Sequence, residues 1–529
     1  MTSPDLQWGN FSAQGPWVLD RDTIAWSRIA VVLRAAAQKE VPALIRSRRI
    51  PPLGRLITVV SYLGWALLPW LIKTKLKKFS TQEESRAYIS RRLRHAIEKL
   101  GATYIKLAQL ISSGEGLFPA ELVNEFKRCR DQVPAEPWDS VKTTVEQDLG
   151  ARIEDVFASF EKTPLAAASI AQVHLATLLS GEEVVVKVQR PSVSEVMRRD
   201  LRVMSWIAPI MIGRIKVSSL ANPPALVEVF AETIVEELDF RMEASNMIDV
   251  AEMLHDLKQD SYLVPRPHSK LVTRRVLVME RLQGFRFDDV DGMRAADIDT
   301  ELVIRAGLIS FMEGALIQGI FHGDLHGGNL FVLEDGRTAL LDFGIVGRLV
   351  DKRRLAFMRF MLSASTNDLN GQVTALRDLG AFPADTDIDA VIKDLGIDQP
   401  VVDPTTLNSE ELVEQGQRII KALLAYGAKL PKELMLYVKN LVFFDGAIAR
   451  LAPDLDIIGE LTNISMIFLQ KHGERLSNDL GVDARSLEID MGSFKAGLGV
   501  DESTESMTYR ELQERRDLIQ KRMRGVSPL

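Results

Sequence analysis

The sequence predicts an α+β protein with two lobes, in which a region of β-strands is preceded by helices and followed by a mostly helical lobe. Residues 163–191 read as two strands around a turn at Gly181, and the second, Val184 to Val188, is strongly β-branched. Apolar residues recur every three to four positions from Ser85 to Phe126, and the pattern beyond Arg353 also reads as helical. The 529 residues, 46% of them hydrophobic, suffice for a large core and are many for one compact domain.

The expected order along the chain is a helical leader, a helical extension, a β-rich lobe with a helical insertion, a helical lobe and a charged tail. The corresponding ranges are 1–80, 81–135, 136–283, 284–480 and 481–529. We find no internal repeat and no low-complexity tract.

Composition limits the function classes. The formal net charge of -7 argues against a general affinity for nucleic acid. The single cysteine, Cys129, excludes an intramolecular disulfide and a multi-cysteine zinc site, and it suits a reducing compartment. Charges such as Asp5 and Arg28 interrupt the first thirty residues, so these do not read as a secretory signal. A cytoplasmic location is therefore expected.

One segment resembles a membrane-contacting helix. Residues 56–72 are seventeen uncharged residues followed by a lysine cluster that ends at Lys78. Seventeen is the lower limit for a spanning helix, and Pro69 is expected to shorten its regular part. The lysines and Trp65 also suit a helix lying on an anionic membrane surface, which leaves open peripheral attachment through residues 56–78 to the inner face of the membrane. The alternative is an apolar helix packed on the protein's own core.

The stretch "HGDLHGGNLF" at 322–331 has two interpretations. His322, Asp324 and His326 have residue types that bind zinc or iron. The same stretch can also be a catalytic loop that serves a nucleotide and magnesium, with His322 supporting the loop through hydrogen bonds.

The residues that follow favour the catalytic loop. Residues 330–333 and 338–341 read as two strands joined by an "EDGR" turn. Because a hairpin brings its outer ends together, we expect Asn329 and Asp342 to be neighbours. Carboxylate and amide oxygens suit magnesium shared with phosphates. An Asp, an Asn five residues later and then Asp-Phe-Gly is the arrangement of a kinase, with Asp324 in the catalytic position.

A nucleotide also needs a cationic anchor and a loop over its phosphates. Lys187, within the β-branched strand, is the candidate anchor, because a buried ammonium is costly without phosphates or a carboxylate partner. That partner is expected from a helix, which offers Glu236, Glu237, Asp239 and Glu243. The candidate loop at 166–171 is rich in alanine where kinases have glycine, and alanine excludes the positive-φ conformations that glycine allows.

From about residue 85 to about 455 these motifs resemble those of the UbiB/AarF family of atypical, protein-kinase-like proteins. "KLAQ" is similar to the family's KxGQ motif, "AAASIAQVH" to its Ala-rich loop, and Glu237 with Asp239 to its ExD motif. The resemblance implies a two-lobed protein-kinase-like fold in which the helical extension packs over the active site. It also implies that Lys106 and Gln109 meet Glu237 and Asp239 near the phosphates, and that Glu243 pairs with Lys187.

The resemblance implies ATP or ADP and Mg²⁺ as cofactors, with Asn329 and Asp342 as metal ligands and Asp324, Lys187 and Glu243 as catalytic residues. The nucleotide-binding set comprises Ala166, Ala167, Ala168, Ser169, Ile170, Lys187 and Glu280. The expected function is a magnesium-dependent ATPase or a small-molecule or lipid kinase that supports isoprenoid-lipid or quinone metabolism. The alternative is a nucleotide-gated lipid-binding or scaffold protein with little turnover.

Several features depart from the family pattern. Ala108 replaces the KxGQ glycine, and "SGEGLFP" follows where an arginine-proline-aspartate is usual. The long separation of Lys187 from Glu243 predicts a helical insertion between strand and partner. The C-terminus is charged, so any membrane contact is expected from the N-terminal part.

Overall fold

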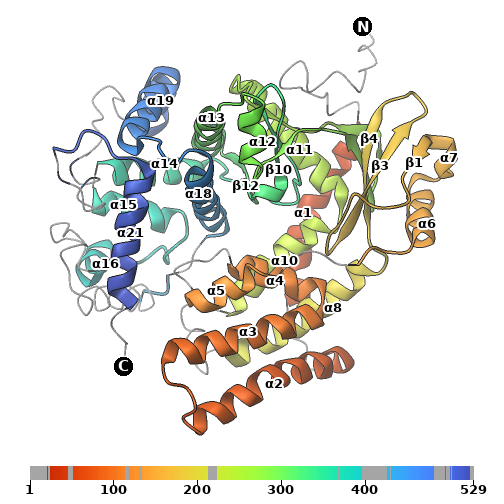
Figure 1. Ribbon diagram of the computed structural model, residues 1–529, viewed down its shortest axis with the longest axis horizontal. Coiled ribbons are helices and arrows are strands. Elements are labelled where there is room, and N and C mark those ends of the chain that lie inside the picture. Colours follow the sequence, from red (N-terminus) through yellow and green to blue (C-terminus); the bar gives the residue numbers. More distant parts are fainter. Residues whose placement is uncertain are drawn as a thin grey trace. The chain divides into compact units, whose positions relative to one another are not determined.

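The computed structural model describes residues 21, 24–45, 52–112, 118–129, 134–211, 223–366, 368–395, 426–428, 431–481, 492, 495, 501 and 503–524. The chain divides into two compact units (Figure 1). The first comprises Met1–His255, Leu263–Gln283 and Leu340–Ile345, and the second comprises Asp256–Tyr262, Gly284–Ala339 and Val346–Leu529. Most of the first thirty residues and most of "SGEGLFP" lie outside the described residues, as do residues 398–406, whose sequence "DQPVVDPTT" is typical of a loop.

The first unit contains an antiparallel sheet with the strand order β1-β3-β4-β7-β6, and β2 pairs with β3. The strands are β1 (Phe157–Phe160), β2 (Ala166–Ala167), β3 (Ala171–Leu178), β4 (Glu183–Gln189), β6 (Pro267–Val272) and β7 (Val276–Glu280). The turn between β3 and β4 uses Gly181 at φ 100°, as the sequence predicted. The short strands β1 and β2 were not resolved by the sequence pattern.

The side chains of β4 alternate between the apolar core and the opposite face of the sheet. Val184, Val186 and Val188 are buried against the helix α6 (Trp138–Leu149) in one apolar cluster. Successive side chains of a strand point to opposite faces, so Lys187 emerges on the other face of the sheet.

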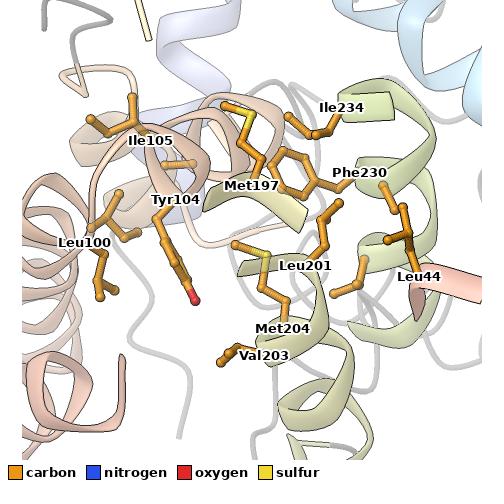
Figure 2. Packing of buried hydrophobic residues seen from close by; sticks show 14 of the residues in the cluster. Leu44, Leu100, Tyr104, Ile105, Met197, Leu201, Val203, Met204, Phe230 and Ile234 are labelled. Carbon is orange, nitrogen blue, oxygen red and sulfur yellow. The ribbon is translucent and has the colours of Figure 1, made fainter. Parts of the chain in front are cut away.

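Three of the described helices lie between β4 and β6. They are α8 (Val193–Met211), α10 (Pro223–Glu237) and α11 (Phe240–Asp256), which confirms the predicted helical insertion. The N-terminal helices are α1 (Ala25–Ile45), α2 (Leu53–Lys75), α3 (Gln82–Leu100), α4 (Ala102–Ser112) and α5 (Ala120–Phe126). Figure 2 shows how Leu44, Tyr104, Leu201, Phe230 and Ile234 turn toward a common apolar core, which joins α1 and α4 to α8 and α10.

Helix α2 differs from its prediction, because it continues through Pro69 without ending there. A proline inside a helix leaves the carbonyl four residues earlier without its usual amide donor. That carbonyl belongs to Trp65, and it accepts a hydrogen bond from the guanidinium of Arg92 in α3. Arg92 also donates to the Ala66 carbonyl at 2.9 Å, so α3 replaces the bond that the proline removes.

The second unit is mostly helical. Its helices are α12 (Val290–Ala295), α13 (Thr300–Glu313), α14 (Lys352–Ser365), α15 (Leu369–Asp378), α16 (Ile388–Leu395), α18 (Lys432–Leu451), α19 (Ile457–Leu480) and α21 (Tyr509–Arg524). The predicted hairpin is present as β10 (Leu330–Val332) and β11 (Thr338–Leu340), which are neighbours in a small sheet with β5 (Tyr262–Leu263) and β8 (Phe285–Arg286).

Helix α13 ends at Glu313, although residues 301–320 read as one helical pattern in the sequence. A π-helical turn, η4 (Gly314–Gln318), follows α13, and Ile320 begins strand β9 (Ile320–His322), which pairs with β12 (Val346–Arg348). Strands of three residues carry too little periodicity to be recognised in a sequence.

Candidate active site

Lys187 lies at the centre of an acidic cluster in the first unit. Its Nζ donates to Oε1 and Oε2 of Glu243 at 2.8 and 3.0 Å, and to Oδ1 of Asp342 at 3.3 Å. The side chains of Lys187 and Glu243 are 14% and 5% exposed. The ammonium also lies 5.5 Å from the ring centre of Phe240, a distance that permits a cation–π interaction. The expected pair of strand lysine and helix glutamate is therefore formed.

The charge on Lys187 is stabilised in spite of its burial. Burial by itself lowers the pKa of this amine, but the carboxylates of Asp342 and Glu243 outweigh it and the net pKa is raised. Lys187 is consequently a permanent cation within reach of a half-exposed carboxylate.

Asp342 has an unusual backbone for a non-glycine residue, with φ at 55°. Such a conformation costs free energy and persists where its surroundings enforce it, often at functional sites. The Asp342 carboxylate accepts from the Gly344 amide at 3.2 Å and its side chain is 50% exposed. The next residue, Phe343, is buried, and its carbonyl accepts from Asn246 Nδ2 of α11 at 2.8 Å. Its neighbours thus hold this segment on both sides.

The helical extension reaches the same segment. Lys106 of α4 forms an ion pair with Glu237 at the end of α10. A Cβ added at Gly344 would lie 3.3 Å from Cγ of Glu237, so the glycine packs closely against that side chain. The Lys106 to Glu237 contact agrees with the resemblance. The Asp239 carboxylate, in contrast, is held by Arg241 at 2.6 and 2.9 Å, and the roles of Asp239 and Gln109 at the phosphates stay predictions.

The alanine-rich loop forms the tight connection from β2 to β3. None of residues 166–171, all of which are described, has a positive φ. The Ala168 amide donates to the Ala171 carbonyl at 2.8 Å, and the side chains of Ser169 and Ile170 are buried. A residue that the sequence interpretation did not assign, Arg190, donates from Nε to the Ala168 carbonyl at 2.8 Å and fixes this loop.

Glu280 ends strand β7 and is 7% exposed. Its carboxylate accepts from the backbone amide of Arg266 at 3.3 Å, and its own amide donates to the Arg266 carbonyl at 2.9 Å. Glu280 thus has a structural partner, and its nucleotide contact stays a prediction.

Asp324 lies on the loop between β9 and the hairpin of the second unit. The Asp324 amide donates to Nδ1 of the buried His322 at 3.1 Å, which is the structural role expected of that histidine. Asn329 Nδ2 donates to the Asp324 carbonyl at 3.1 Å and closes the loop across five residues. The amide oxygen of Asn329 therefore points away from that bond.

Two adjacent residues of α18 complete this loop, and the sequence interpretation missed both. Lys439 forms an ion pair with the Asp324 carboxylate. Asn440, fully buried, accepts from the Leu325 amide at 3.2 Å and donates to the His322 carbonyl. No sequence signal singles them out, because they lie in an ordinary helix 115 residues or more from their partners.

The structure gives no support to a zinc or iron site at the histidines. Nδ1 of His326 accepts from the Gly328 amide at 3.1 Å, as Nδ1 of His322 does from Asp324. Among the described residues, no group of three or more His, Cys, Asp or Glu side chains could hold a metal ion.

Magnesium that is shared with phosphates needs fewer protein ligands than zinc or iron does. It retains several waters and needs only one or two carboxylates, with hard oxygen donors around them. The carboxylate of Asp342, which is 50% exposed, is a donor of this kind. It therefore suits magnesium bound together with a nucleotide, and Asn329 as a second ligand stays a prediction.

Comparisons with known proteins show the family of this chain. Residues 128–376 match the family model described as the ABC1 atypical kinase-like domain. The uncharacterized protein Rv0647c of Mycobacterium tuberculosis H37Rv is 36% identical over 384 residues, which cover 70% of this chain and 78% of that protein. The chain belongs to the ABC1/UbiB/AarF family of atypical kinase-like proteins.

Other members of the ABC1/UbiB/AarF family are similar over comparable lengths. The probable protein kinase UbiB of Pseudomonas aeruginosa PAO1 is 32% identical over 440 residues, covering 79% of each chain. An uncharacterized aarF domain-containing protein kinase of Arabidopsis thaliana chloroplasts is 34% identical over 391 residues, covering 69% of this chain and 72% of the other. Among solved structures, the Rv3197–erythromycin complex of Mycobacterium tuberculosis aligns with TM-score 0.37 and 21% identity, over 67% of this chain and 93% of that one.

Proposed function

We propose that this atypical kinase-like protein is a magnesium-dependent ATPase or a kinase of a small, lipid-like molecule. The observation that carries the proposal is the bridge from Lys187 to both Glu243 and Asp342. A buried ammonium with two carboxylates is the form in which a kinase-like fold keeps its phosphate anchor charged and fixed.

Each residue has a proposed task. Lys187, held by Glu243, binds the phosphates of ATP, and Asp342 with Asn329, at the two ends of one hairpin, holds magnesium. The metal, when bound, neutralises charge that develops on the phosphate oxygens. Asp324 orients the attacking hydroxyl or water and accepts its proton, and the γ-phosphoryl group passes to that oxygen while ADP leaves. The ion pair with Lys439 holds the Asp324 carboxylate in place for this task.

The test is the Asp342→Asn variant. It keeps the shape of the side chain but removes the charge that binds magnesium, so we expect magnesium-dependent ATP hydrolysis to fall by about 100-fold or more. The matched control is Asp335→Asn in the neighbouring hairpin turn, where the carboxylate pairs with Arg337. Wild-type turnover in Asp342→Asn, or equal losses in both variants, would refute the assignment.

A lipid-linked role is supported by the surface of α2. This helix is long and apolar enough to cross a membrane, yet most of it is exposed. A spanning orientation would bring the Arg92 guanidinium, bonded at Ala66 and Trp65, into hydrocarbon, which is costly. We therefore propose that α2 lies on the membrane surface. The exposed apolar side chains contact the lipid: Leu53, Ile57, Val60, Leu68, Leu71 and Ile72. The lysines near the end of the helix contact anionic headgroups: Lys75, Lys77 and Lys78.

Vesicle binding checks this surface. We expect the protein to sediment with vesicles that contain phosphatidylglycerol, and to sediment less with vesicles of pure phosphatidylcholine. Leu68→Glu should reduce sedimentation with both kinds of vesicle. Val32→Glu, at an exposed apolar residue of α1, is the control. Sedimentation that Leu68→Glu leaves unchanged would contradict the proposal.

The alternative function is a nucleotide-gated lipid-binding or scaffold protein with little turnover. It is favoured by the extension that reaches the Asp-Phe-Gly segment through Lys106 and Glu237. Vesicles that raise ATP affinity but leave turnover near zero would support this alternative over the kinase.

A further inference from the structure

Helix α11 carries a row of polar residues in line with the catalytic glutamate. Glu243, Asn246, Asp249 and Glu252 follow one another at intervals of three, so each is about one turn from the next and the row winds around the helix away from Glu243. The first three are buried. Glu243 meets Lys187, whereas the other three have a different set of partners.

Those partners come from the N-terminal helix and the residues just before it. Arg34 of α1 donates from Nη2 to Asn246 Oδ1 at 2.9 Å and to Asp249 Oδ2 at 3.5 Å. Arg21 donates to Asp249 Oδ1 at 2.5 Å and to Glu252 at 2.6 and 2.9 Å. Burial by itself lowers the pKa of Arg21, but its carboxylate partners outweigh burial and raise it, so the charge is kept. Two arginines thus follow the polar row away from the catalytic centre.

The contact between Arg34 and Asn246 determines how the asparagine is oriented. Arginine can only donate, so it requires the oxygen of the Asn246 amide on its own side. The NH₂ group of Asn246 is then directed at its other neighbour, the Phe343 carbonyl, at 2.8 Å. Arg34 therefore acts through Asn246 on the backbone of the Asp-Phe-Gly segment and, through α11, on Glu243.

Helix α1 does not depend on Arg34 for its place. Buried Trp26, Ala30, Val41 and Leu44 pack it against the unit, and Arg198 of α8 forms a separate ion pair with Glu40. A variant at Arg34 should accordingly fold, and a variant at Arg198 removes an anchor of the same helix that does not touch α11.

We propose that Arg34, supported by Arg21, is a positioning residue for the Lys187–Glu243 pair and the Asp-Phe-Gly segment, so that the N-terminal helix is part of the nucleotide-binding machinery. This inference rests on the proposed function for its consequence in catalysis. It assigns that task to residues well ahead of 128–376, the part that matches the kinase-like family model.

The test measures Lys187 without a nucleotide. An amine reagent, methyl acetimidate, is applied to the full-length protein, and modification of Lys187 is followed by mass spectrometry. Modification requires that the Lys187–Glu243 ion pair is broken. Loss of one charge-assisted hydrogen bond changes the fraction of molecules with a broken pair by about tenfold. We expect Arg34→Ala to raise the modification rate of Lys187 by up to about this factor, Arg34→Lys to restore most of the protection, and Arg198→Ala to leave the rate unchanged.

A second variant tests the path through Asn246. If Arg34 acts through that side chain, Arg34→Ala adds nothing to the modification rate of Asn246→Ala. Hydrogen exchange of the amides of residues 343–345 should rise in Arg34→Ala and stay at the wild-type level in Arg198→Ala. Thermal unfolding identifies any variant that is globally destabilised.

The outcomes separate the two proposals. Equal modification of Lys187 in wild type, Arg34→Ala and Arg198→Ala, or equal increases in both variants, overturns the positioning role. Failure of Mg-ATP to protect Lys187 in the wild type overturns the proposed function, while the difference between the two arginine variants would still establish the positioning role.

Discussion

Two lysine–glutamate pairs hold the Asp-Phe-Gly segment of the first unit, and they differ in origin. Lys187 and Glu243 connect the sheet to α11, and the same lysine bonds Asp342. Lys106 and Glu237 connect α4 of the extension to α10, and the glutamate packs against Gly344. The first pair has side chains 14% and 5% exposed, and the second 20% and 9%. One pair belongs to the kinase-like core and the other attaches helix α4 of the N-terminal part.

The different burial and connections of the two pairs predict different roles for them. A buried ion pair contributes little net stability. Removing one partner nevertheless lowers the free energy of unfolding strongly, because the other charge is left buried and unpaired. The Lys187 pair is therefore expected to be needed both for the fold and for nucleotide binding. The Lys106 pair should control the attachment of the extension and leave the phosphate anchor intact.

The largest effect is expected from Lys187→Met. The buried Glu243 carboxylate loses its partner, so the free energy of unfolding should fall by about 3–5 kcal/mol and ATP binding should be lost. Chemical denaturation and nucleotide titration measure the two effects. The double variant Lys187→Met with Glu243→Gln should recover most of the stability and none of the binding. A double variant as unstable as the single one would contradict the stranded-charge explanation.

A smaller effect is expected from Lys106→Met. Glu237 is slightly less enclosed than Glu243, and we expect a loss of about 2 kcal/mol, faster amide exchange in α4 and unchanged protection of Lys187. The control is Lys142→Met, whose pair with Glu154 is exposed and whose loss should leave the free energy of unfolding close to that of wild type. If Lys187 became more reactive toward the amine reagent in Lys106→Met, the two pairs would not have separate functions.

The smallest effect comes from pH, through His268 of β6. Burial, with Lys270 and Arg266 nearby, lowers the pKa of this histidine to about 4, and its Nδ1 accepts from the amides of Lys270 and Leu271. The folded state therefore takes up the proton later than the unfolded state, and stability falls as pH drops from about 6.5 to about 4. After a discount for partial exposure we expect about 1–2 kcal/mol from this residue.

His268→Asn measures this contribution, because it keeps an acceptor for both amides but does not titrate. Comparison of its unfolding free energy with that of wild type at pH 7 and pH 4 separates histidine protonation from any loss of either lysine–glutamate pair. A gap between the two proteins that stays constant with pH would show that His268 does not titrate in this range.

Much of the core of this fold was predictable, and the reasons are local. The β-branched residues of β4, the turn at Gly181 and the residues of the hairpin before Asp342 each specify their structure within a few positions. The helix sequence left four carboxylates open as the partner of Lys187, and the resemblance to the UbiB/AarF family selected Glu243 among them. Helix α2 was predicted less well, because Arg92 in another helix satisfies the carbonyl that Pro69 leaves open.

The remaining contacts of the site could not be predicted, because they join residues far apart in ordinary helices. Arg34 meets Asn246 across 212 positions and Lys439 meets Asp324 across 115. Nothing local distinguishes these side chains from the many arginines, lysines and asparagines on helix surfaces. Only the packing of the helices selects them.

The contribution of Asn440 to the loop at Asp324 has a consequence for how the protein is made. Asn440 bonds residues 115 and 118 positions earlier in the chain. Domains fold while the ribosome is still adding residues, and contacts of long sequence separation form last. A nascent chain that already contains every kinase-like motif, through Asp342, still lacks the helix that fixes this loop. The protein should therefore complete this loop only late in its synthesis.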